Sequence, residues 1–203
     1  IDGKTVRLSE SKGRYTLVSF NRFAACPLCN LAVREFSRKA PELAARNLRI
    51  ISFFESSEEN LKKALETWGP LTFELVADPL AAVYSQYDVP TSAWGFTKAM
   101  VRVGAFVESF KVGLPKGVGQ DGSKTRMPAA FFLGPDLRVI EAYVGTDAGD
   151  HVPVATVERW LQQVAAPRVR DRRGEAERRV RAVADGLVAA HDQIARAVVG
   201  PLD

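Results

Sequence analysis

The chain's two cysteines lie close together, in the run Cys26-Pro-Leu-Cys29. An apolar, β-rich run at 15–20 comes just before them, and an amphipathic stretch from 28 to about 45 follows. This order predicts a strand, a short loop and a helix whose first turn carries both sulfurs. Two thiols on one helical turn can close to a disulfide and reopen. The pair therefore indicates redox chemistry and requires a fold in which a helix begins at the end of a strand.

Cys26 is expected directly before this helix, with Pro27 in its first turn, where the N–H that proline lacks would have no partner. The unpaired N–H groups of that turn and the helix dipole would then favour the thiolate of Cys26. Cys29 lies one turn deeper and should be less exposed and more thiol-like. We therefore predict that Cys26 attacks and that Cys29 closes the disulfide.

Two other interpretations of the dithiol stay open, namely buried structural cysteines and half of a zinc site. A zinc site of this kind needs two more ligands, and the only histidines, His151 and His191, are far away in the sequence. We therefore expect no metal here and assign neither histidine a catalytic role.

Two further segments carry candidate residues. Arg22 lies four residues before Cys26, in the predicted loop between strand and helix. Its guanidinium either pairs with a thiolate or sulfenate or is simply solvated. The other segment is Arg126-Met127-Pro128, just before an apolar run. A proline can begin a strand after a loop because no ladder bond is lost there.

Hydrophobic patterning predicts an α/β domain with a mixed central sheet flanked by helices. Parallel units come first, and a late hairpin adds an antiparallel edge. The helix after Cys26 should be kinked or divided at Pro41. The expected strands are 16–20, 48–54, 71–77, 129–133 and 139–144, with an opening strand or hairpin at 1–8, and the expected helices are 28–45, 56–68, 80–87 and 154–164.

Residues 1–166 are expected to form one domain with an insertion at 88–125, and 167–203 an Arg-rich C-terminal helical extension. The segment 168–181 carries seven arginines against three acidic residues, which accounts for the net charge of +4. The basic balance therefore describes the extension and not the active domain. Acidic residues interrupt the basic run and no aromatics are interleaved. A solvated helix or a packing arm for a second subunit is thus favoured over nucleic-acid or lipid binding.

Within the insertion, Phe96 and Met100 belong to an apolar series at helical spacing that spans 94–114. It predicts a helix packed on the sheet; a homodimer surface or a wall of the active-site groove are the alternatives. The Gly-rich segment 111–125 should be mobile. No apolar run is long enough for a membrane span, so no membrane partner is expected. Two close cysteines make no disulfide framework, which favours a reducing, cytoplasmic location.

Residues 1–166 resemble the peroxiredoxin-like branch of the thioredoxin superfamily, the alkyl hydroperoxide reductase and thiol-specific antioxidant group. The resemblance implies a thioredoxin-like fold and reduction of hydroperoxides without a metal or organic cofactor. Cys26 would become a sulfenic acid, Cys29 would condense with it, and an external thioredoxin- or glutathione-like thiol would reduce the disulfide. The matching segments are Asp2-Gly-Lys-Thr-Val-Arg-Leu-Ser9, Leu17-Val-Ser-Phe20, Arg22 with Cys26-Pro-Leu-Cys29, Asp78-Pro79 and Phe131-Phe-Leu-Gly-Pro-Asp136.

The same resemblance implies a substrate groove. In thioredoxin-like folds a cis-proline faces the dithiol, a place that falls on Pro128; an ordinary trans proline at a strand start is the alternative. Pro27, Phe23 and Met127 would line the groove beside it. Arg126 corresponds loosely to an arginine that the family places before the same strand. It would then approach the attacking sulfur, or else be a rim arginine without a role.

The chain also departs from the family pattern. Typical peroxiredoxins carry Pro seven residues and Thr or Ser three residues before the attacking cysteine, where this chain has Ser19 and Phe23. The hydroxyl that would orient the peroxide is therefore absent. The Arg-x-x-x-Cys-Pro-x-Cys pattern is similar to the peroxiredoxin-like 2 type, whose dithiol is closer to those of thioredoxins and glutaredoxins. Three functions stay open: hydroperoxide reduction, thiol–disulfide exchange with the same dithiol, and a non-catalytic thioredoxin-fold binding module.

Overall fold

The structure is a computed structural model that describes residue 1, residues 3–101 and residues 113–165. Three predictions lie outside the described residues. They are the second half of the 94–114 helix, the beginning of the Gly-rich segment, and the whole Arg-rich extension at 167–203 with His191.

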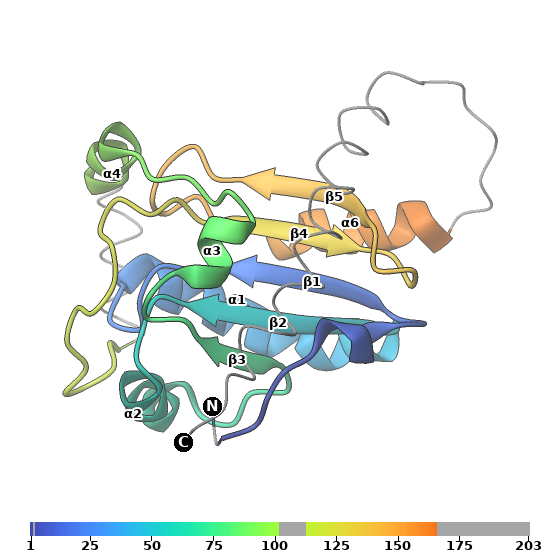
Figure 1. Cartoon of the computed structure of the whole chain (residues 1–203), viewed down its shortest axis with the longest axis horizontal. Helices are drawn as coiled ribbons and strands as arrows, with labels where there is room; N and C mark the ends of the chain where they lie inside the picture. The colour runs from blue at the N-terminus through green and yellow to red at the C-terminus, as the bar shows by residue number, and fades with distance from the viewer. Residues whose placement is uncertain (2, 102–112, 166–203) are drawn as a thin grey trace, which may run out of the picture.

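A five-stranded mixed sheet forms the centre of the fold (Figure 1). The strand order is β3-β2-β1-β4-β5, with the three N-terminal strands parallel and β4 antiparallel to both of its neighbours. This confirms the predicted α/β class with its late antiparallel hairpin. The strands are β1 (Tyr15–Phe20), β2 (Leu48–Phe54), β3 (Glu74–Ala77), β4 (Ala129–Leu133) and β5 (Val139–Val144).

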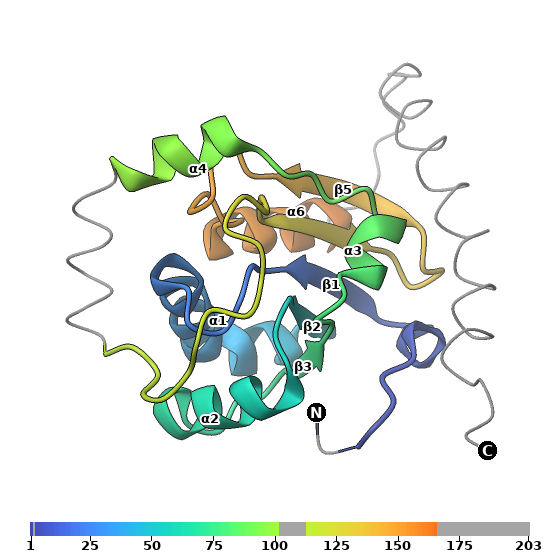
Figure 2. The same ribbon diagram turned by 60° about the vertical axis from the view of Figure 1, so that its left-hand side comes forward.

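Helices cover both faces of the sheet (Figure 2). The helices α1 and α6 pack on one face, where Leu17 of β1 meets Phe36 and Trp160 in the main core. The short α3 packs on the other face, where Val18 and Tyr84 belong to a second core. The two cores follow from the alternation of side chains along a strand. The helices are α1 (Pro27–Ala45), α2 (Glu58–Trp68), α3 (Ala82–Gln86), α4 (Ala93–Met100) and α6 (Val154–Ala165).

Two predicted details are wrong. The described residues of 1–8, which are residue 1 and residues 3–8, form no strand, and a 3-10 helix at Leu8–Ser11 follows instead. Buried Arg49 explains this, because its Nη1 donates to the carbonyl of Arg7 and the hydroxyl of Ser11 and so holds the segment as a turn. The predicted division of the helix at Pro41 is also wrong, since α1 runs through it, whereas a kink there stays a prediction. Pro41 is exposed, so water can satisfy the carbonyl that loses its helical partner.

The sheet brings the ends of the parallel strands together at one edge. β1 ends at Phe20 and β2 ends at Phe54. The chain continues from β1 into the loop 21–26 and from β2 into the loop 55–57. The carboxyl edge of parallel strands is where open α/β sheets place their sites. None of the helices in the described part of the chain has the length and apolar character needed to cross a lipid bilayer.

Candidate active site

The dithiol sits at the start of α1, as predicted. Cys26 is the N-cap residue with extended backbone, Pro27 follows in the first turn, and the Cys26 Sγ accepts a hydrogen bond from the backbone N–H of Cys29 at 3.4 Å. Both thiols are free. Cys29 is fully buried, but Cys26 is only 1% exposed, so the difference in exposure predicted between them is small. The structure therefore shows a reduced dithiol covered from solvent.

The two sulfurs have opposite acidities. Burial alone would raise the pKa of Cys26. The thiol of Cys29, the charge of Arg22 and the N–H groups of Cys29 and Leu28 outweigh burial and lower the pKa to about 7. The pKa of Cys29 is raised well above its ordinary value by burial and by its hydrogen bond to Cys26. Cys26 is thus the thiolate of the pair and Cys29 the proton donor, which is the predicted division.

Arg22 is the cation of the site, and it is buried. Its side chain lies over the rings of Phe23 and Phe96, at 5.3 and 5.6 Å from their centres. Its Nη1 donates to the carbonyl of Ala148 at 3.4 Å, and its Nε has no hydrogen-bond partner among the described residues. At 5% exposure Arg22 is not the solvated arginine that was the alternative. A buried donor of this kind is suited to an anion next to it.

Apolar side chains close the site around the sulfurs. Phe23, Leu28 and Met127 belong to one buried cluster with both cysteines. Met127 also lies against Gly95 of α4, where a Cβ atom would lie 2.6 Å from its sulfur, so any other residue there would require the Met127 side chain to move. Phe23 and Met127 thus lie by the dithiol as predicted, and they are buried together with both sulfurs.

Pro128 differs from its prediction. It is buried and its carbonyl accepts from the N–H of Gly145 at 2.8 Å, but its peptide bond is trans, since the described residues contain no cis peptide bond. The trans form is the less costly one. It also continues the chain directly into β4, which pairs from Ala129 onward. The alternative of an ordinary strand-start proline is correct.

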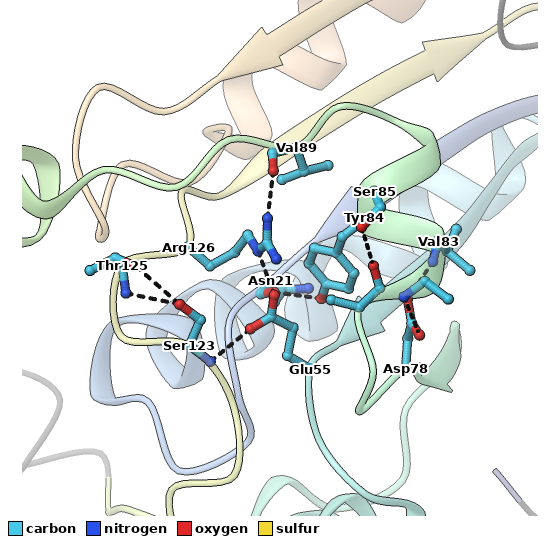
Figure 3. Close-up of polar contacts among 12 residues, drawn as sticks. Asn21, Glu55, Asp78, Val83, Tyr84, Ser85, Val89, Ser123, Thr125 and Arg126 are labelled. Atoms are coloured by element: carbon cyan, nitrogen blue, oxygen red, sulfur yellow. Dashed lines mark hydrogen bonds and ion pairs between the residues drawn. The ribbon is translucent and has the colours of Figure 1, made fainter.

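Arg126 also lies in a different place from the one predicted. It pairs with the buried carboxylate of Glu55, donates to the carbonyl of Val89 at 2.6 Å and lies over the ring of Tyr84 (Figure 3). Glu55 directly follows β2, and its carboxylate binds the guanidinium of Arg126. This ion pair holds Arg126, so the arginine does not bind the sulfur of Cys26. Of the two arginines predicted at the site, only Arg22 is among the groups that lower the pKa of Cys26.

Hydrogen bonds to Glu55 and its two following residues hold the loop before β4. Ser123 N–H donates to Glu55, and Asp121 accepts from Ser56 and from the backbone of Ser57. The sequence predicted a mobile Gly-rich segment here, but these bonds anchor its second half. Gly122 permits the contact, because a Cβ there would lie 2.5 Å from the Glu55 carbonyl. Ser56 in turn accepts from the N–H of Ala24, so the loop also supports the residues before Cys26.

Arg126→Met is expected to destabilise the protein by about 3–5 kcal/mol, because it leaves Glu55 buried without its charge partner. The pKa of Cys26 should change little. Denaturant unfolding measures the first effect and a thiolate titration the second. A matched Glu55→Gln/Arg126→Met double variant should recover most of the loss. A large rise in the pKa of Cys26 with unchanged stability would place Arg126 at the dithiol after all.

Sequence analysis missed one residue of the site, Asn30. Its amide binds the carbonyls of Ala24 and Cys26, and it is 2% exposed. The available signal was a polar residue on the face of α1 that also carries buried Val33. No cluster of three or more metal-ligating side chains occurs in residues 1, 3–101 and 113–165.

Comparison with known proteins bears on this arrangement. The model of the AhpC/TSA family matches residues 1–142. No curated protein sequence matches the chain. Solved structures with the same fold include the bacterioferritin comigratory protein of Xanthomonas campestris, studied for alkyl peroxide reduction, at 16% identity and a TM-score of 0.56 over 82% of this chain and 86% of that one.

Two other solved structures match this chain with comparable identities and TM-scores. PrxQ of Xylella fastidiosa has 18% identity and a TM-score of 0.56 over 81% of this chain and 84% of that one. A candidate thiol:disulfide interchange protein DsbE from Chlorobium tepidum has 16% identity and a TM-score of 0.50 over 79% and 84%. These likenesses confirm the thioredoxin-like fold.

Proposed function

The chain belongs to the AhpC/TSA family, and we propose that it is a thiol-dependent oxidoreductase that reduces hydroperoxides through Cys26, with Cys29 as the resolving residue. One observation carries the proposal. The Cys26 sulfur lies at the N-terminus of α1, where it accepts from the Cys29 N–H and has a pKa lowered to about 7, although burial opposes this. A thiolate populated at neutral pH is the nucleophile that an O–O bond requires.

The proposed reaction has three steps. The Cys26 thiolate attacks one peroxide oxygen, the O–O bond breaks, and the leaving alkoxide takes a proton from water, which yields an alcohol and a sulfenic acid. The Cys29 sulfur then attacks the Cys26 sulfur, and water leaves as the disulfide forms. An external dithiol, or two monothiols of the thioredoxin or glutathione kind, returns two electrons and two protons.

The spacing of the two cysteines suits the second step. Residues three apart in a helical turn have their Cβ atoms about 5–6 Å apart, whereas a disulfide needs them about 3.5–4.5 Å apart, so closure has to bring the two Cβ atoms together by roughly 1–2 Å. The Cys29 backbone N–H already donates to the Cys26 sulfur. Resolution therefore needs only a small adjustment of the first turn of α1.

Arg22 supplies what the missing hydroxyl would supply in typical peroxiredoxins. Phe23 holds the position of that hydroxyl, and its ring cannot accept or donate in the same way. The Nε–H of Arg22 has no partner among the described residues and lies in a buried setting beside the thiolate. It is the donor available to a peroxide or sulfenate oxygen.

Thiol–disulfide exchange is the second candidate function, and Phe23 is the observation that favours it. Without an oriented hydroxyl, peroxide displacement loses a contact, whereas attack on a disulfide needs only the thiolate and a nearby second thiol. A non-catalytic binding module has less support, because such a module has no need of a thiolate kept at neutral pH. A reducing, cytoplasmic location is proposed only from the sequence, because two close cysteines make no disulfide framework.

A second copy of this chain is the further partner that we propose, on the basis of exposed apolar side chains on α4. Trp94 and Val101 at the two ends of α4 are 70% and 77% exposed. These apolar side chains support the alternative interpretation of the 94–114 segment as a homodimer surface. No nucleic-acid or membrane partner is proposed.

Stopped-flow mixing of the reduced protein tests the proposal. We expect rapid loss of the Cys26 thiolate with an alkyl hydroperoxide, followed by a Cys26–Cys29 disulfide detected by mass. Slow loss with peroxide, together with ready exchange with a disulfide peptide, would replace the first function by the second. Inertness toward both reagents would leave the binding module.

A further inference from the structure

The side chain of Asn30 donates both amide hydrogens to the dithiol loop and accepts with its oxygen from one neighbouring helix. Its Nδ2 donates to the carbonyl of Ala24 at 2.9 Å and to that of Cys26 at 2.7 Å. Its Oδ1 accepts from the indole N–H of Trp68, at the end of α2, at 2.5 Å. The two carbonyls need donors and the indole needs an acceptor, so these three partners fix which way the amide points.

These contacts hold the backbone of residues 24–26, the loop that leads into the dithiol helix. Both backbone polar groups of Ala24 are bound. Its carbonyl accepts from Asn30, and its N–H donates to the hydroxyl of Ser56 at 2.9 Å. The Cys26 carbonyl also accepts the first helical bond, from the backbone N–H of Asn30 at 3.0 Å. The amide therefore restrains the rotation of the peptide unit that sets the direction of the Cys26 side chain.

We propose that Asn30 is a positioning residue of the dithiol, which keeps the sulfur of Cys26 aligned with the N–H groups of the first turn of α1 and is itself oriented by Trp68. Asn30 does not touch the reacting atoms and acts through the backbone of residues 24–26. The inference deepens the proposed function and rests on it for its kinetic consequences. Its structural part concerns only how well the thiolate is stabilised.

The indole of Trp68 supports the Asn30 amide from outside α1. Trp68 is the last residue of α2, and its ring packs against that of Phe54 at 5.5 Å between centres. Phe54 ends β2 and is fully buried. The orientation of the Asn30 amide is thus tied to the sheet, and the alignment of Cys26 does not depend on α1 alone.

Asn30→Ala tests the inference. Its carbonyl partners lose their donor, so the Cys26 side chain should spend less time over the helix N-terminus. We expect the pKa of Cys26 to rise by about one unit, seen in the ultraviolet absorbance of the thiolate. The rate with an alkyl hydroperoxide should then fall about tenfold near pH 6 and equal that of the unmodified protein near pH 9, where both are ionised.

Two variants accompany it. Trp68→Phe keeps an aromatic ring against Phe54 but removes the N–H together with one ring of the indole, so it should raise the pKa in the same direction by less. Leu43→Ala, at the far end of α1 and 1% exposed, destabilises the same helix but should leave the pKa unchanged. If Asn30→Ala does not fold, Trp68→Phe decides the question.

Three results would overturn the inference: an unchanged pKa in Asn30→Ala, an unchanged pKa in Trp68→Phe when Asn30→Ala cannot be studied, or a rate loss equal at both pH values. The titration needs no substrate. A raised pKa in a protein that proves inert toward peroxide would therefore support the role of Asn30 while rejecting the proposed function.

Discussion

Cys26→Ser is expected to abolish turnover with every substrate, whereas Cys29→Ser should keep one round of reaction. Only Cys26 has a pKa lowered to about 7, and Cys29 stays protonated because burial raises its pKa. Without Cys26 no nucleophile is left. Without Cys29 the peroxide is still reduced once, and the sulfenate or a mixed disulfide with the reductant accumulates. Serine at 29 keeps a donor for the Cys26 sulfur, so the attacking thiolate is retained.

Single-turnover mixing followed by intact mass measures this difference. Cys29→Ser should gain one oxygen with peroxide, at a rate close to that of the unmodified protein. Cys26→Ser is the matched control, in which the other cysteine remains and should gain nothing. Equal loss of the first round in both variants would contradict the division of labour.

Arg22→Met should have the second largest effect. Arg22 is the only side-chain cation among the groups that lower the pKa of Cys26, and burial opposes that lowering. Its loss is expected to raise the pKa by one unit or more, which reduces the thiolate at neutral pH about tenfold per unit. Because its Nε is also the free donor toward the substrate oxygen, part of the rate loss should persist at high pH.

Arg22→Lys separates the two contributions. Lysine keeps the positive charge but lacks the planar guanidinium that lies over Phe23 and Phe96. We expect the pKa of Cys26 to stay close to that of the unmodified protein while the rate at high pH falls. A pKa unchanged in Arg22→Met, read from the thiolate titration, would remove Arg22 from the site.

Local sequence determined the parts of this site that depend on neighbours along the chain. The strand before the dithiol, the N-cap position of Cys26 and the proline in the first turn all follow from a stretch of about 15 residues around it. Arg22 could be found the same way, because it lies on the same loop. The order of acidities was predicted from helix geometry, and the structure adds the Cys29 thiol and the charge of Arg22 to the groups that lower the pKa of Cys26.

Long-range contacts decided what the sequence could not predict. Arg126 carries the charge expected beside the dithiol, but the partner that takes it, Glu55, is 71 residues away. The opening segment has a plausible strand pattern, yet Arg49 binds its carbonyl and hydroxyl groups from β2. Asn30 escaped notice because its role depends on Trp68, whose approach is fixed by the packing of α2.

The pH dependence of the Cys26 thiolate tests the central claim most directly. Its ultraviolet absorbance is to be followed in the reduced protein across the neutral range, with Cys26→Ser as the blank. We expect a transition near pH 7, and a rate with substrate that rises about tenfold per pH unit below it and levels off above it. A sulfur that stays protonated to the ordinary pH of a free thiol, with a rate still rising there, would contradict the account.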